Sequence, residues 1–197
     1  ISGAGTDEII INGVDNLVES IFAIPADRIE AGTYLIAAAV TNGDITIQNI
    51  NPNRMNNILD KLKLSGADIE TNENSISLSM PNETINSVDI STAPFPGFPT
   101  DMQAQFTVLN ALSSSSAVVT ENVFENRFMH VQELNRMGCD ITVKGSNAFV
   151  KGVNFLTGAP VMATDLRASA SLILAGLCAD GETIVDRIYH IDRGYER

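Results

Sequence analysis

Three nearly uncharged helical segments, each opened by an aspartate, constrain the fold of this 197-residue chain more than any other feature. The apolar runs are YLIAAAV after Asp27, MQAQFTVLNAL after Asp101 and SASLILAGL after Asp165. A helix that is apolar around most of its circumference, and too short to cross a membrane, is buried on nearly all sides. The sequence therefore predicts three helices that lie side by side in the interior.

The segments that follow these helices indicate an internal repeat. Sixteen residues after each marker aspartate stand Gly43, Ala117 and Gly181, and each leads into a β-branched run. Gly43 and Gly181 are therefore predicted to end a helix and to precede a strand. The marker aspartates are 74 and 64 residues apart, and this unequal spacing favours divergent repeats in one compact body over an open solenoid.

Each repeat continues into an amphipathic helix. An Asn-Arg pair opens the matching segments, at Asn53–Arg54 in NPNRMNNILDKLKLSGADI and at Asn126–Arg127 in FENRFMHVQELNRMGCDI, and Asp192–Arg193 stands there in the third copy. Upstream of the marker aspartates, DEIIINGVDNL matches NAFVKGVNFL, with NSISLSMP as the middle counterpart. One unit is thus predicted as strand, buried helix, strand, outer helix, strand, strand, which makes the fold class α/β.

The net charge and the cysteine content limit the classes of function that the chain can have. The net charge of −12 and the pI near 4.4 argue against binding of nucleic acid or of an anionic membrane over a broad surface. Two cysteines, Cys139 and Cys178, imply no disulfide framework, and both are expected to pack as small apolar residues. With no signal peptide in view, we expect a cytoplasmic protein, and we expect neither a metal nor a cofactor.

Arginines recur at the edges of the repeated elements. Arg28 and Arg167 fall in the first turns of buried helices, and Arg127 and Arg193 fall in the turns before outer helices. Arginine near a helix N-terminus is well placed to hold an anion, although ion pairs with acidic neighbours in the chain are the alternative. Arg54, in a Lys- and Asp-rich context, is interpreted as a surface residue.

Asp101 allows two interpretations. Thr100 or Asp101 can be an N-cap, since either side chain can accept a hydrogen bond from a free N–H of the first helical turn. The alternative is a role other than capping, since Asp101 is a lone carboxylate before a helix that is otherwise nearly devoid of charge.

Five segments resemble the enolpyruvyl transferases: RIEAGTYLIAAAVT, PGFPTDMQAQF, VFENRFMHVQELNRMG, ATDLRASASLILAGL and IYHIDRGYER. The resemblance covers the whole chain and is closer to the members that act on UDP-N-acetylglucosamine than to those that act on shikimate 3-phosphate. It implies two globular domains, each an inside-out α/β barrel of three strand-helix units, with substrates bound between them. Residues 1–25 then correspond to the end of the first domain and the crossover, and residues 26–197 to most of the second domain.

The resemblance also implies an activity, the transfer of the enolpyruvyl group from phosphoenolpyruvate to the 3-hydroxyl of UDP-N-acetylglucosamine, the first committed step of peptidoglycan synthesis. In this view Asp101 is the general base. Thr100 and the backbone at Val123 contact the UDP-sugar, while Asp27 remains a helix cap.

The remaining polar residues would serve phosphoenolpyruvate. By the same resemblance, Asp165 and Arg167 organise its pocket. Arg127 and Arg193 lie near its anionic groups, with Arg193 as a second catalytic residue. Each of these arginines also lies at the start or turn of a repeated element. Because elements of one repeat type should end on the same side of the body, we expect Arg127, Arg167 and Arg193 to converge with Asp101 on one open face.

Two family features are not matched in this chain. The cysteine-bearing loop that donates a proton, and an early Lys-Asn pair that binds phosphoenolpyruvate, lie N-terminal to the segments quoted above. We therefore expect a fragment that is inactive alone and has the missing N-terminal half of the same enzyme as its partner. Two alternatives stay open: a sister transferase acting on shikimate 3-phosphate, and a non-catalytic repeat scaffold.

Overall fold

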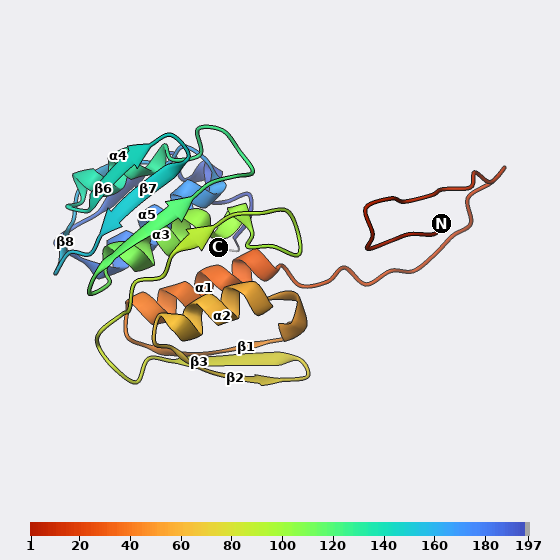
Figure 1. Ribbon diagram of the computed structural model, residues 1–197, viewed down its shortest axis with the longest axis horizontal. Coiled ribbons are helices and arrows are strands. Elements are labelled where there is room, and N and C mark those ends of the chain that lie inside the picture. The colour runs from red at the N-terminus through yellow and green to blue at the C-terminus, as the bar shows by residue number, and fades with distance from the viewer. Residues whose placement is uncertain (196–197) are drawn as a thin grey trace.

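Three adjacent helices form the centre of the fold. The computed structural model describes residues 1–195, and its central helices are α1 (Arg28–Val40), α3 (Gln103–Ala111) and α5 (Leu166–Cys178). Each of the three contacts the other two, and the β-sheets lie outside them (Figure 1). The prediction that the apolar helices lie side by side is confirmed.

The central helices differ in how completely they are covered. Every residue of α3 is buried, whereas α1 exposes Tyr34 and α5 exposes Ile173 and Leu177. One continuous hydrophobic core nevertheless joins the three units, and Leu35 and Phe106 are among its fully buried members. Burial of this apolar surface is the main contribution to the stability of the domain.

A buried hydroxyl recurs at one position of the repeat. The sixth residue after each marker aspartate is Thr33, Thr107 or Ser171, and all three are buried. Their hydroxyls donate to carbonyl groups of their own helices at 2.9, 2.9 and 2.7 Å. A threonine or serine hydroxyl can thus form its hydrogen bond within its own helix. These polar residues can therefore be buried in the core without an unpaired hydroxyl.

The first unit places an antiparallel sheet on the outside. Strand β3 is central, and its register pairs Ile45 with Leu78. Helices α1 and α2 cover one face of the sheet (Figure 1). The elements are β1 (Asp44–Gln48), η1 (Pro52–Arg54), α2 (Asn56–Leu64), β2 (Asp68–Asn72) and β3 (Ser75–Ser79).

The second unit repeats this plan with a four-stranded sheet in the order β4-β5-β7-β6. The pair β4 and β5 is parallel, and the other pairs are antiparallel. A 3-10 turn, η2, comes directly before α3. The elements are β4 (Ile90–Ser91), η2 (Thr100–Met102), β5 (Ser116–Thr120), α4 (His130–Arg136), β6 (Asp140–Lys144) and β7 (Asn147–Lys151).

The third unit consists of short parallel pairs around α5. Strand β8 pairs with β10, and β9 pairs with β11. Among residues 1–195, no helix is long and apolar enough to cross a bilayer. The elements are β8 (Leu156–Thr157), β9 (Pro160–Met162), β10 (Ala179–Asp180), β11 (Ile184–Asp186) and η3 (Ile188–His190).

The glycines do not end the helices as the sequence predicted. After α1, the left-handed residue is Asn42, with φ 55°, and not Gly43. After α5, the chain enters β10 before Gly181 turns it with φ 90°. Asparagine tolerates the left-handed region better than most residues, so an Asn-Gly pair can place the turn one residue early.

Residues 1–27 leave the body of the domain as an extended segment (Figure 1). In this part of the described chain, an isolated bridge between Ser2 and Ile10 takes the place of the expected strand in DEIII. A strand needs a partner for its backbone hydrogen bonds, and none lies beside this segment. A domain boundary near residue 25 remains a prediction.

Candidate functional site

An open pocket of about 570 Å³ lies at one end of the central helices, between the second and third units. Asp101, Asp165, Arg127, Arg167 and Arg193 all line it. These five residues come from four separate segments of the chain. The convergence of Arg127, Arg167 and Arg193 with Asp101 was expected from the repeat pattern. The remaining lining residues are Phe124, Glu125, Asn126, Met129 and Leu166.

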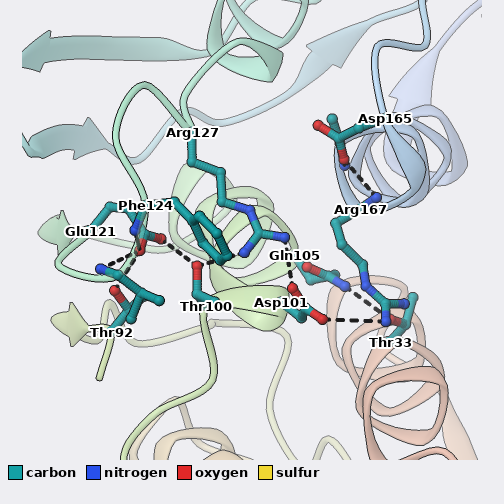
Figure 2. Close-up of polar contacts among 12 residues, drawn as sticks. Thr33, Thr92, Thr100, Asp101, Gln105, Glu121, Phe124, Arg127, Asp165 and Arg167 are labelled. Carbon is teal, nitrogen blue, oxygen red and sulfur yellow. Dashed lines mark hydrogen bonds and ion pairs between the residues drawn. The ribbon is translucent and has the colours of Figure 1, made fainter. Parts of the chain in front are cut away.

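Asp101 is bound by two guanidinium groups. Its Oδ1 lies 2.6 Å from Nη2 of Arg127, and its Oδ2 lies 3.5 Å from Nη2 of Arg167 (Figure 2). The Asp101 side chain is 39 % exposed, which leaves it accessible from the pocket. A carboxylate held by charge-assisted hydrogen bonds keeps a defined orientation.

Asp101 and Thr100 do not cap a helix, so the N-cap interpretation of these residues was wrong. The 3-10 turn η2 places both residues inside the first turn, and neither η2 nor α3 has a side-chain cap. The physical reason is that the Asp101 carboxylate is turned to Arg127 and Arg167 and away from the backbone.

The other two marker aspartates are caps. Oδ1 of Asp27 accepts from the N–H of Ile29 at 2.7 Å and from that of Glu30 at 3.4 Å. Oδ1 of Asp165 accepts from the N–H groups of Arg167 and Ala168 at 2.8 and 2.9 Å. Asp165 therefore combines a place in the pocket wall with a local duty at the start of α5.

Arg127 is held on three sides. Its Nη1 donates to Oγ1 of Thr100 at 2.6 Å and its Nη2 donates to Asp101, while its guanidinium carbon lies 4.9 Å from the centre of the Phe124 ring. Its partner Thr100 lies behind the pocket wall and donates in turn to Glu121 (Figure 2). A planar guanidinium suits this combination of paired hydrogen bonds and stacking.

Val123 lies on the other side of the same loop. Val123 lines a second pocket of about 450 Å³, together with Gly145 and Ser146. Among the described residues that line the Asp101 pocket, Val123 is absent. Its N–H already donates to Oε1 of Glu121 at 2.9 Å. The expected contact of the Val123 backbone with a UDP-sugar stays a prediction.

The other arginines considered in the sequence analysis lie in two different places. Arg193 lines the Asp101 pocket from the third unit and, within residues 1–195, makes no ion pair. Arg28 and Arg54 together line two other pockets, away from Asp101. Arg28 lies 5.6 Å from the centre of the Phe95 ring. The structure thus separates Arg28 from the anion-binding candidates.

His130 is a buried titratable group beside the pocket that sequence reasoning missed. Burial lowers its pKa from 6.5 to about 4, with Asp165 acting to raise the pKa and Arg127 acting to lower it. Its Nε2 has no hydrogen-bond partner among the described residues. Its position three residues after Arg127, at the start of α4, is the only signal in the sequence that could have suggested it.

The composition of the pocket favours anionic ligands. Three guanidinium groups line it beside the carboxylates of Asp101, Glu125 and Asp165, and Oδ1 of Asp165 accepts from two backbone N–H groups. Within residues 1–195, no group of three His, Cys, Asp or Glu side chains is placed to hold a metal ion. Arginines beside an accessible carboxylate can bind phosphate or carboxylate groups next to a proton acceptor.

Known proteins resemble the chain over its whole length. A family model described as EPSP synthase (3-phosphoshikimate 1-carboxyvinyltransferase) matches residues 1–197. UDP-N-acetylglucosamine 1-carboxyvinyltransferase of Coxiella burnetii (strain Dugway 5J108-111) is 59 % identical over 196 residues, and the same enzyme of Vesicomyosocius okutanii is 57 % identical. All of this chain is covered, but only 45 % and 47 % of those relatives, so the chain spans about half of their length.

Solved structures support the fold. The enolpyruvyl transferase NikO from Streptomyces tendae matches with a TM-score of 0.80 at 25 % identity, over 87 % of this chain and 41 % of its own. An EPSP synthase from Acinetobacter baumannii matches with a TM-score of 0.66 at 18 % identity, over 87 % of this chain and 43 % of its own. The predicted inside-out α/β barrel of repeated strand-helix units is therefore confirmed as the fold class.

Proposed function

Because the chain belongs to the EPSP synthase family, we propose that it is part of an enzyme that transfers the enolpyruvyl group of phosphoenolpyruvate to the 3-hydroxyl of UDP-N-acetylglucosamine. Relatives named for this activity are 57 to 59 % identical to the chain, and the matched EPSP synthase structures are only 18 % identical. We propose the activity for a longer protein of which this chain is a part, since about half of each relative lies outside the match.

The observation that carries the proposal is the Asp101 carboxylate, which caps no helix and lies in the pocket between Arg127 and Arg167. In the proposed reaction, Asp101 accepts the proton of the sugar 3-hydroxyl as that oxygen bonds to C2 of phosphoenolpyruvate. A base is effective when it is within hydrogen-bond reach of the proton and its pKa is suited to the transfer. Domain closure over the pocket would exclude water from the carboxylate and the reacting groups.

The three arginines have a clear duty in such a reaction. Phosphoenolpyruvate brings a phosphate and a carboxylate next to the diphosphate of the acceptor, and these anions repel one another. Arg127, Arg167 and Arg193 line the pocket, and in the proposed reaction they bind these anions there. Fixed cations in a closed site offset this repulsion and stabilise charge that develops in the transition state. Asp165 would support this group by fixing the start of the helix that carries Arg167.

The proposed activity also implies partners, a cellular location and a cellular role. The expected partners are the two small-molecule substrates and the other half of the same enzyme, which would supply the proton donor for C3 of phosphoenolpyruvate. Such an enzyme would act in the cytoplasm, where nucleotide sugars are made, and would serve peptidoglycan synthesis and hence cell shape and division. This chain alone is expected to be inactive.

A second candidate is 3-phosphoshikimate 1-carboxyvinyltransferase, which the description of the family model favours. Phosphate release from phosphoenolpyruvate, measured on the complete protein with each acceptor in turn, separates the two. We expect release with UDP-N-acetylglucosamine and none with shikimate 3-phosphate. Release with shikimate 3-phosphate alone would overturn the proposal, and release with neither would favour a non-catalytic scaffold.

A further inference from the structure

Glu121 follows β5 directly, and its carboxylate is buried behind the Asp101–Arg127 ion pair with only 3 % of the residue exposed (Figure 2). We propose that Glu121 is a positioning residue, which fixes Thr100 and the loop of residues 122–127 so that Arg127 is aimed at Asp101 and the pocket. The effect on catalysis rests on the proposed function, whereas the effect on the Arg127 geometry does not.

The carboxylate of Glu121 accepts four hydrogen bonds. Its Oε1 accepts from the hydroxyl of Thr92 at 2.8 Å and from the N–H groups of Val123 and Phe124 at 2.9 and 3.1 Å. Its Oε2 accepts from the hydroxyl of Thr100 at 2.8 Å. A buried carboxylate is tolerated when it is hydrogen-bonded in this way, and the donors come from three separate segments that it joins together.

The first consequence concerns the direction of the Thr100 hydrogen bonds. A threonine hydroxyl has one proton, and Thr100 gives it to Glu121. The oxygen of Thr100 can then only accept, and it accepts from Nη1 of Arg127 at 2.6 Å. Glu121 therefore makes Thr100 an acceptor, which draws one side of the guanidinium inward while the other side reaches Asp101.

The second consequence concerns the loop that carries Arg127. The bonds from Val123 and Phe124 to Glu121 fold the start of this loop, and the N–H of Asn122 donates to Oγ1 of Thr92 at 2.8 Å. The ring of Phe124 then lies beside the guanidinium of Arg127. Thr100, which accepts a hydrogen bond from Arg127, and Phe124, which stacks on it, are thus both held by one carboxylate.

The repeats show that the fold itself does not require this carboxylate. In the first and third units, the residue directly after the corresponding strand is Asn49 or Arg187. Both are exposed, and both adopt left-handed backbone with φ 60° and 63°. Only the unit that carries Asp101 and Arg127 buries a carboxylate there, which indicates a role in the pocket more than in the strand-helix unit.

The first test is Glu121→Gln in the complete protein. Glutamine keeps the size but places an NH2 donor among groups that are themselves donors, so the hydrogen bonds of Thr100 and the loop must rearrange. Misplacement of a binding group by about 1 Å can reduce a rate about 100-fold, and we expect kcat/KM to fall about 10- to 100-fold. The control is Glu133→Gln on α4, outside the pocket, which we expect to change kcat/KM less than about twofold.

The second test asks whether Glu121 acts through Thr100. Thr100→Val removes the hydroxyl that links Glu121 to Arg127, and Thr100→Ser restores it. We expect Thr100→Val to lose activity to the same extent as Glu121→Gln, and Thr100→Ser to keep most of the activity. The Glu121→Gln/Thr100→Val double variant should be no less active than the poorer of the two single variants. Residues that act as a unit are non-additive, so losses that multiply would overturn the proposal.

The third test does not depend on turnover. A crystal structure of the Glu121→Gln protein should show Nη1 of Arg127 displaced from Thr100, and retention of both the Thr100 and Asp101 contacts would contradict the positioning role. If the parent protein fails to use UDP-N-acetylglucosamine, the proposed function fails while this structural test still stands. If Glu121→Gln does not fold, the structures and activities of Thr100→Val and Thr100→Ser decide the same point.

Discussion

Asp27 and Asp101 stand at equivalent positions of two repeated units, but only Asp27 caps its helix. Oδ1 of Asp27 accepts from a backbone N–H at 2.7 Å, and Oδ1 of Asp101 accepts from the guanidinium of Arg127 at 2.6 Å. The same residue type at the same repeat position thus performs two different tasks. The pair offers a matched comparison of capping with function.

Asp101→Asn in the complete protein tests the proposed general base. Asparagine retains the size and one oxygen but cannot accept the proton of the sugar hydroxyl. Loss of a general base lowers the rate by about 10²- to 10⁴-fold, so we expect the loss mainly in kcat, measured by phosphate release under saturating substrates.

Asp27→Asn is the control for this prediction. Asparagine caps a helix about as well as aspartate, so both kcat and the melting temperature should stay close to those of the parent protein. A near-normal kcat in Asp101→Asn would instead mean that the Asp101 carboxylate serves only to orient Arg127 and Arg167.

Arg193→Ala tests the anion-binding role of the third arginine. Arg193 lines the pocket without an ion pair in the described part of the chain, so its removal should cost little stability. We expect kcat/KM for phosphoenolpyruvate to fall at least about tenfold, since a charge-assisted contact to the ligand is lost. Arg54→Ala, in the equivalent turn of the first unit, should leave kcat/KM within about twofold, and equal losses in both variants would contradict the assignment.

His130 should make stability depend on pH. Its pKa is about 4 in the folded protein, against the ordinary value of 6.5, because burial disfavours the charged form. Between pH 6.5 and about 4 the unfolded chain binds a proton that the folded protein does not, so stability falls as the pH falls through this window and levels off below it. The contribution is about 3 kcal/mol at most.

Urea unfolding of the complete protein at several pH values checks this prediction. His130→Gln should flatten the loss of stability between pH 6.5 and about 4. The matched control is His190→Gln in η3, at a half-buried histidine, which should keep the slope of the parent protein. An unchanged slope in His130→Gln would show that other groups cause the pH dependence.

Cys139 and Cys178 should resist thiol reagents in the folded protein. Burial raises their pKa to about 12 and about 11, so the reactive thiolate is scarce at pH 8. We expect peptide mass spectrometry to find both thiols unmodified after native treatment with iodoacetamide and fully modified after unfolding. Rapid native labelling of Cys139 would mean that the core opens more readily than its burial implies.

The sequence by itself determined the central architecture. Runs such as YLIAAAV and SASLILAGL have no polar face, so they had to be buried, and three of them in repeated units had to share one interior. The positions of Arg127, Arg167 and Arg193 at element edges also followed from local patterns. Five motifs were enough to indicate the enolpyruvyl transferase fold.

Only the tertiary structure decided which partner each carboxylate takes. Asp27, Asp101 and Asp165 are indistinguishable as caps by local sequence, but η2 and two guanidinium groups from other segments draw Asp101 away from its backbone. The link from Glu121 through Thr100 to Arg127 likewise joins residues that are 21 and 27 positions apart.

The physical reason is the range of the forces that each feature depends on. Helix burial follows from the apolar pattern of a dozen consecutive residues, which the sequence displays directly. A hydrogen bond forms only when donor and acceptor come within about 3 Å, and Arg193 reaches the pocket of Asp101 across 92 residues of chain. Packing of the three units sets such distances, so the site could be anticipated as a set of residues but not as a geometry.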